Sequence, residues 1–186
     1  MLHCARQCIA LRGDHEKLDS IGNPGKFLSP MRLIATHDAK LKQHLDMPKL
    51  KNVTYLSVEK QNEMINVIGN RMIQSKIVQE VKDARIYTIM VDEVTSHNTE
   101  LMPVCIRFVD TDWTIREELL EMVSLKHITG LHIANKIKDM LGRLSLSINC
   151  RGQGYDGASN MSSDRVGVQA PIRQDAPNAA IIVSTW

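Results

Sequence analysis

Two aspartates, far apart in the sequence, have the residue type and the setting that metal-dependent chemistry needs. Asp92 ends the apolar, β-favouring run R-I-Y-T-I-M-V-D at residues 85–92, which is typical of a central strand buried on both faces. A carboxylate at such a point costs several kcal/mol to desolvate unless a partner or a metal compensates. Asp156 lies in the glycine-rich block R-G-Q-G-Y-D-G-A-S-N-M at residues 151–161. We therefore treat Asp92 and Asp156 as candidate catalytic residues and metal ligands.

The chemistry open to two neighbouring carboxylates is set by their charge. Two carboxylates in one cleft repel each other unless a cation lies between them, and hard divalent ions prefer oxygen ligands. In two-metal phosphoryl transfer, ions about 3.5 to 4 Å apart stabilise the attacking and leaving oxygens of a phosphodiester. Mg²⁺ or Mn²⁺ is the cofactor expected if the site is active, and no organic cofactor is expected. Glu93 points to the opposite face by strand alternation, so it is not counted as a ligand.

The elements that must bring the aspartates together read strand, strand, strand, helix, strand. The strands are predicted at 85–94, at 104–110 beyond a proline, at 114–125, and at 146–150. The third segment is ambiguous, because E-E-L-L-E-M favours a helix and hairpin spacing favours a strand, and we choose the strand. A helix over 129–144 precedes the fourth strand. A right-handed crossover would return that strand parallel to the first, so that both aspartates share one cleft.

Residues 1–83 are predicted to form a separate helical region. A short helix is expected over 2–12, and a second from Pro30, with Ser29 as its cap, to about residue 45. The clearest helix spans 57–83 and carries a stripe of apolar residues at three- and four-residue spacing, namely Met64, Ile65, Ile68, Met72, Ile73, Ile77 and Val81.

Length, charge and cysteine usage restrict the class of protein. A chain of 186 residues suits one medium domain with a helical extension. Residues 1–83 hold thirteen Lys and Arg against nine Asp and Glu, and residues 84–186 hold ten against twelve. This tilt permits a nucleic-acid partner without arguing for one. No signal peptide or long apolar run occurs, so we expect an intracellular protein, nuclear or cytoplasmic, with no membrane partner.

Two further motifs admit an alternative interpretation. His3, Cys4 and Cys8 could form half of a zinc site, although no second Cys/His pair lies nearby and a helical face is favoured. Gly152, Gly154 and Gly157 follow a strand with the spacing G-x-G-x-x-G, which raises nucleotide binding as an alternative. Against it, an aspartate within the motif would face the pyrophosphate and Pro171 interrupts the expected helix-to-strand unit.

Several motifs together resemble the hAT-type transposase-derived proteins, in particular those described as zinc finger MYM-type or TTF-type. The motifs are V-D-E-V-T at 91–95, R-F-V-D at 107–110, C-R-G-Q-G-Y-D-G-A-S-N-M at 150–161 and G-V-Q at 167–169, with A-L-R-G, N-P-G-K-F and Y-L-S-V-E-K-Q-N-E in the N-terminal part. The resemblance implies an α/β class with a partial ribonuclease-H-like fold over residues 84–186. It also implies that Asp92 and Asp156 match the first two metal-binding aspartates of a DNA-cutting and joining enzyme.

The same resemblance indicates what this chain lacks. The third acidic residue of the family, a Glu, lies downstream in a region that this chain does not contain, as does the dimerisation region, and the zinc-finger module is absent from the N-terminal side. We therefore expect a truncated or domesticated, catalytically inactive protein that retains DNA or protein binding. Its oligomeric state stays open. Gly152, Gly154 and Gly157 are expected to shape the loop around Asp156.

Overall fold

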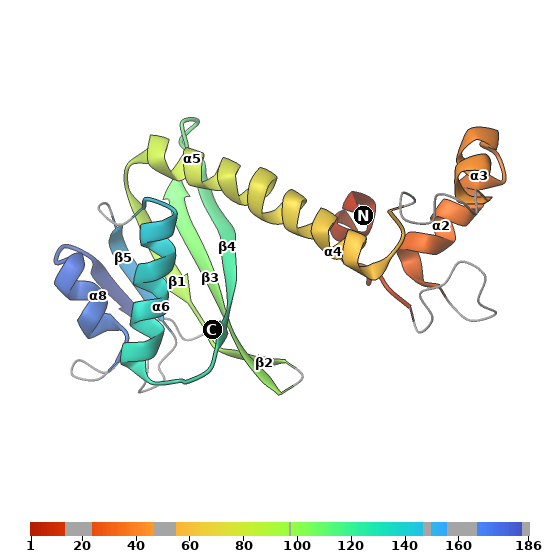
Figure 1. Cartoon of the computed structure of the whole chain (residues 1–186). Helices are drawn as coiled ribbons and strands as arrows, with labels where there is room; N and C mark the ends of the chain where they lie inside the picture. The colour runs from red at the N-terminus through yellow and green to blue at the C-terminus, as the bar shows by residue number, and fades with distance from the viewer. Residues whose placement is uncertain (14–23, 47–54, 97, 147–149, 156–166, 184–186) are drawn as a thin grey trace. The chain divides into compact units, whose positions relative to one another are not determined.

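The computed structural model describes residues 1–13, 24–46, 55–96, 98–146, 150–155 and 167–183 (Figure 1). Contacts between residues group the chain into two units, Met1–Arg71 and Met72–Trp186.

The first unit is helical, as the sequence predicts, but its helices are shorter than expected. They are α1 (Leu2–Arg6), α2 (Gly25–Ala35), α3 (Ala39–Asp46) and α4 (Val58–Asn66). The helix expected over 2–12 ends at Arg6, and Cys8 just beyond it adopts a left-handed φ of 51°. Cys4 is buried and Cys8 is exposed, so the two thiols lie in different environments.

The prediction that a helix starts at Pro30 is wrong, because Pro30 lies inside α2. Proline has no N–H, so the carbonyl of Lys26, four residues earlier, loses its usual helical partner. The thiol of Cys4 donates to that carbonyl at 3.5 Å. A buried thiol from α1 thus compensates for the proline in α2.

The expected continuation of this helix to residue 45 is also wrong, because the chain breaks between α2 and α3. The Asp38 side chain lies just before α3, and its Oδ1 accepts hydrogen bonds from the backbone N–H groups of Lys40 at 2.9 Å and Leu41 at 3.0 Å. These contacts satisfy donors that the first turn of a helix leaves unpaired. Asp38 therefore starts a new helix.

The predicted helix over 57–83 is confirmed as three successive segments: α4, η2 (Val67–Gln74), which is π-helical, and α5 (Ser75–Ala84). Ser57 caps α4 by accepting a hydrogen bond from the N–H of Lys60 at 3.4 Å. In the apolar stripe, Ile77 and Val81 are buried in the core of the second unit, whereas Met72 and Ile73 are exposed. The sequence pattern did not predict the π-helical segment.

The described residues of the second unit form one mixed sheet, the end of η2 and the helices α5, α6 and α8. Its strands are β1 (Tyr87–Val91), β2 (Val94–Ser96), β3 (Thr99–Val109), β4 (Ile115–Leu125), β5 (Cys150–Tyr155) and β6 (Ala180–Val183), and its further helices are α6 (Gly130–Arg143) and α8 (Gln169–Asp175). The strand order is β2-β3-β1-β5-β6, with β4 on the other side of β3. The β1–β5 and β5–β6 pairs are parallel and the others antiparallel. The predicted succession of strands and crossover helix is confirmed.

Three details of the sheet differ from the prediction. The fourth strand, predicted at 146–150, is β5 at Cys150–Tyr155, because Gly152 and Gly154 pair with β1 as strand residues and not as a loop. The sheet does not end at its fourth predicted strand, because β6 pairs with β5 beyond it. The strand expected beyond Pro103 begins at Thr99 and contains the proline. The β1–β3 pairing stops at Val91↔Val104 and the β2–β3 pairing resumes at Val94↔Leu101. Pro103 thus faces the interruption between β1 and β2, where its missing N–H costs no hydrogen bond to those strands.

The core lies on one face of the sheet. Residues Tyr87, Ile89 and Val91 of β1 are buried there, whereas the alternate residues Thr88 and Met90 are only half-buried. The expectation that β1 is buried on both faces is therefore met on one face alone. Buried side chains from the other elements include Val81, Met102, Val104, Ile106, Phe108, Ile133, Ile137, Met140, Tyr155 and Ile172.

A β-bulge in β4 is held by two polar side chains. Val104 pairs with Glu121 and Cys105 pairs with Leu119, so Leu120 is an extra residue in β4. The buried Gln74 amide donates to the carbonyl of Leu120 at 3.0 Å and to Glu121 Oε2 at 3.2 Å. Arg143 Nη2, at the end of α6, contacts the same carboxylate at 2.9 and 2.8 Å. The bulge therefore joins two helices to the sheet.

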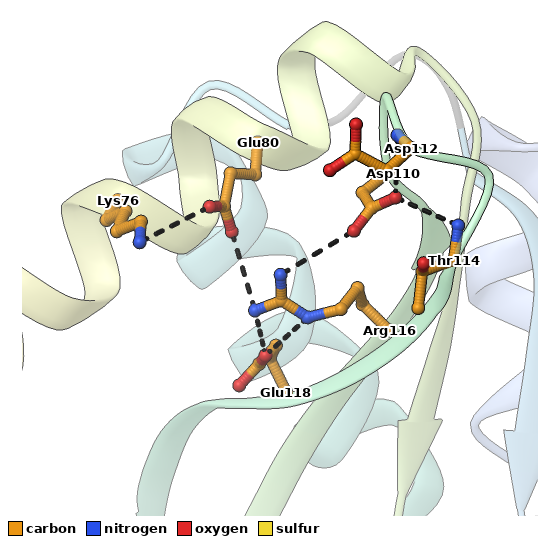
Figure 2. Close-up of polar contacts among 7 residues, drawn as sticks. All are labelled: Lys76, Glu80, Asp110, Asp112, Thr114, Arg116 and Glu118. Carbon is orange, nitrogen blue, oxygen red and sulfur yellow. Dashed lines mark hydrogen bonds and ion pairs between the residues drawn. The ribbon is translucent and has the colours of Figure 1, made fainter.

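A second polar cluster ties α5 to the β3–β4 hairpin (Figure 2). The Arg116 guanidinium lies 3.7 Å from Glu80 on α5 and 3.8 Å from Asp110 in the turn. It also donates to Glu118 on its own strand, with Nε at 3.0 Å from Oε1. Lys76 extends the cluster by lying 3.7 Å from Glu80. One cation thus holds three carboxylates from three segments of the chain.

We expect Gln74→Ala to lower the free energy of unfolding by about 1 to 3 kcal/mol, because it leaves a buried carbonyl at the bulge without a donor. Gln79→Ala is the matched control, since Gln79 is exposed and its amide contacts only the exposed Asp83 among the contacts described. That control should change stability by less than about 0.5 kcal/mol. Urea denaturation followed by circular dichroism measures both. Equal effects of the two substitutions would contradict the role of Gln74.

Candidate metal centre

The carboxyl ends of β1 and β5 lie side by side. The two strands run parallel, and their last register pair is Val91↔Tyr155. Parallel neighbours are about 4.8 Å apart. Asp92 directly follows Val91 in the sequence, and Asp156 directly follows Tyr155. Asp156 itself lies outside the described residues, so the pairing of the two carboxylates stays a prediction.

Asp92 lies at the surface, in the interruption between β1 and β2. Its side chain is exposed, and its Oδ1 accepts a hydrogen bond from the N–H of Glu93 at 2.8 Å. The expected cost of desolvating this carboxylate therefore does not arise, because Asp92 is exposed to solvent. Glu93 is half-buried.

The residues beneath this edge are apolar or neutral. Val91 and Tyr155 are almost fully buried. The Tyr155 hydroxyl donates to Gln153 Oε1 at 2.7 Å. Burial raises the pKa of Tyr155 well above its ordinary value, so the phenol stays protonated and keeps donating. The last residues of the two strands therefore carry no charge.

The donor set in the described part of the chain does not fit a pair of metal ions. Within those residues, no group of three or more His, Cys, Asp or Glu side chains is arranged to hold a metal. A two-metal site needs oxygen donors on both sides of each ion. Asp92 with Asp156 would supply ligands for one cation at most.

The structure corrects the role expected for two of the three glycines. Gly152 and Gly154 lie inside strand β5 and are buried, whereas Gly157 lies outside the described residues. A Cβ on Gly152 would lie 2.4 Å from Thr88 Oγ1, and one on Gly154 would lie 3.2 Å from Met90 Cγ. Both glycines therefore make room for side chains of β1. They do not form a phosphate-binding turn, which removes the basis for nucleotide binding.

An α/β fold with an antiparallel meander, a crossover helix and two parallel strands defines the class of ribonuclease-like domains. In this chain the candidate site lies at the carboxyl ends of β1 and β5, where that class predicts it. The chain belongs to the DUF4371 family, described as "ZMYM1/FAM200, RNase-like domain", and the match covers residues 1–167. This membership confirms the predicted resemblance to hAT-derived, zinc finger MYM-type proteins. It also confirms the predicted partial ribonuclease-H-like fold.

Two curated relatives match a shorter part of the chain. They are the human and the mouse "52 kDa repressor of the inhibitor of the protein kinase", each 27% identical over 132 residues. The match covers 69% of this chain and 17% of each relative, so the chain corresponds to a small part of those proteins. In the part of the chain that the structure describes, we find no helix with the length and apolarity needed to cross a membrane.

We expect Gly152→Ala to destabilise the fold by about 1 to 3 kcal/mol, because the added methyl group overlaps the Thr88 side chain. Thermal denaturation should show a smaller loss when the substitution is made in a Thr88→Ala background. Gly142→Ala in α6 is the control, since a Cβ there meets nothing within 4 Å. The packing role of Gly152 would be wrong if the loss were the same in both backgrounds.

Proposed function

We propose that this chain is a domesticated ribonuclease-like domain that does not cleave DNA and works by binding another macromolecule. The observation that carries the proposal is the ligand count at the strand ends. Val91 and Tyr155 are register partners, which favours Asp92 and Asp156 as neighbours, and among the described residues no group of three or more His, Cys, Asp or Glu side chains is placed to hold a metal. Two carboxylates can hold one cation, whereas the two-metal mechanism needs a second ion to stabilise the leaving oxygen.

Charge favours a protein partner over DNA. Residues 84–186 carry ten Lys and Arg against twelve Asp and Glu. Binding of DNA depends chiefly on the neutralisation of phosphates by clustered basic side chains. At the candidate site, the exposed Asp92 and the adjacent Glu93 add negative charge, which repels phosphate unless a divalent cation is bound. We therefore propose that the second unit binds another protein.

The names of the relatives agree with a binding role. Two proteins that contain a similar segment are each called a repressor of an inhibitor of a protein kinase. A domain can act in repression by binding its partner, without catalysing a reaction. We propose that this chain, in the nucleus or the cytoplasm, contributes a protein-binding ribonuclease-like fold to such a task.

Metal-dependent phosphodiester cleavage is the second candidate function. The same register pair favours it, since neighbouring strand ends are where a ribonuclease-H-like enzyme holds its first two aspartates. It requires a third carboxylate from another segment or another chain. Asp92 and Asp156 would then be metal ligands, with Mg²⁺ or Mn²⁺ as the cofactor.

Incubation of the purified chain with an end-labelled DNA duplex and Mg²⁺ or Mn²⁺ separates the two candidates. We expect no cleavage, and no change in fluorescence anisotropy of the duplex at physiological salt. The variants Asp92→Asn and Asp156→Asn serve as controls. Cleavage that both substitutions abolish would establish the second candidate and refute the first. Cleavage that survives both would place the chemistry at other residues.

A further inference from the structure

Trp113 occupies a backbone position that suits glycine. It lies in the turn between β3 and β4 with a left-handed φ of 62°. Hairpin loops of three residues end on such a left-handed residue, and glycine or asparagine is favoured there because a Cβ is strained in that region. A large aromatic side chain at this place costs conformational free energy in the monomer.

The turn holds Trp113 firmly in that conformation. The N–H of Asp110 donates to the Thr114 carbonyl at 3.0 Å, and the N–H of Trp113 donates to the Asp110 carbonyl at 3.1 Å. Asp110 Oδ1 also accepts from the N–H groups of Asp112 and Thr114, each at 2.9 Å (Figure 2). The Arg116 cluster fixes Asp110 from the other side. The hydrogen-bonded turn therefore fixes the backbone from which the Trp113 indole extends.

The indole gains nothing from packing in its own chain, because Trp113 is 90% exposed. Tryptophan is the residue type most enriched among those that dominate binding at protein interfaces. A residue that is both strained and exposed in the monomer is best explained by a contact that forms outside it.

An apolar hollow lies at the same end of the sheet as Trp113. Its volume is about 350 Å³, and its walls include Ile86, Thr88, Arg107, Phe108, Val109 and Ile115. Three of these side chains are themselves exposed to an unusual degree for large apolar residues, Ile86 and Ile115 at 58% each and Val109 at 44%. The hollow can receive an aromatic side chain from outside.

Opposite charges accompany the indole and the hollow. Asp112 is exposed beside Trp113, and Arg85 is exposed between Ala84 and Ile86, which both line the hollow. A partner that binds in the hollow should carry an aromatic side chain next to an acidic one. A partner that binds the Trp113 turn should carry an apolar hollow next to a basic side chain. This chain carries both halves at one end of its sheet, and an isologous contact needs both halves on each copy.

We propose that two copies of this chain associate around a two-fold axis, each inserting Trp113 into the hollow of the other and pairing Asp112 with Arg85 of that copy. This surface lies at the amino end of β1, whereas Asp92 follows its carboxyl end. The association is therefore separate from any metal at the strand ends.

Sedimentation equilibrium of the full chain over a range of concentrations tests the association. We expect a monomer–dimer equilibrium whose Kd rises at least about 30-fold in Trp113→Gly, the loss typical of an interface hot spot. Glycine suits the left-handed turn, so this variant should fold at least as well as the parent chain, which thermal denaturation checks. Gln79→Ala, on the exposed face of α5, should leave the Kd unchanged.

Charge reversal identifies the second copy as the occupant. Asp112→Arg and Arg85→Asp should each weaken the dimer, and the double variant should recover most of the lost affinity. A parent chain that stays monomeric at every attainable concentration would overturn the proposal and point to a different protein as the occupant. So would a dimer whose Kd is unchanged in Trp113→Gly, or a double variant no stronger than the single ones.

Discussion

Parallel pairing of β1 with β5 is the constraint on which the second unit depends. Helix α6 must carry the chain back across the sheet so that β5 lies beside β1 and not beside β4. The Tyr87 hydroxyl, buried at the start of β1, donates to the carbonyl of Leu146 in the segment that follows α6. Gly152 and Gly154 then let β5 approach the side chains of β1. The position of Asp92 next to the end of β5 follows from this one pairing.

Polar contacts pair those groups of the second unit that its apolar core, on one face of the sheet, leaves without a partner. Apolar burial holds α5, α6 and α8 against a single face of the sheet. Apolar packing provides no partner for the Leu120 carbonyl at the β4 bulge or for the Asp110 carboxylate in the β3–β4 turn. Gln74 donates a hydrogen bond to the carbonyl, and Arg116 forms an ion pair with the carboxylate. These two side chains couple the helices to particular points of β4.

The sequence predicts those parts of the fold whose apolar pattern is local. The apolar run of β1 and the amphipathic pattern of α6 predict a strand and a helix from neighbouring residues alone, and hairpin spacing predicts the strand β4. The misplaced boundaries have long-range causes. Pro30 is tolerated inside α2 because a thiol from α1 reaches the open carbonyl, and Pro103 is tolerated in β3 because its neighbour strand is interrupted there. No local pattern contains that information.

The candidate site shows the same limit, since the sequence placed Asp92 at a strand end but could not tell that it is exposed, or that Gly152 and Gly154 belong to a strand. The most direct measurement is titration of Mn²⁺ followed by electron paramagnetic resonance for the parent chain, Asp92→Asn, Asp156→Asn and the double variant. If the adjacent strand ends share a cation, a single Mn²⁺ binds, each substitution alone abolishes that binding, and the double variant loses nothing more. Binding that survives either substitution would show that the two carboxylates do not meet.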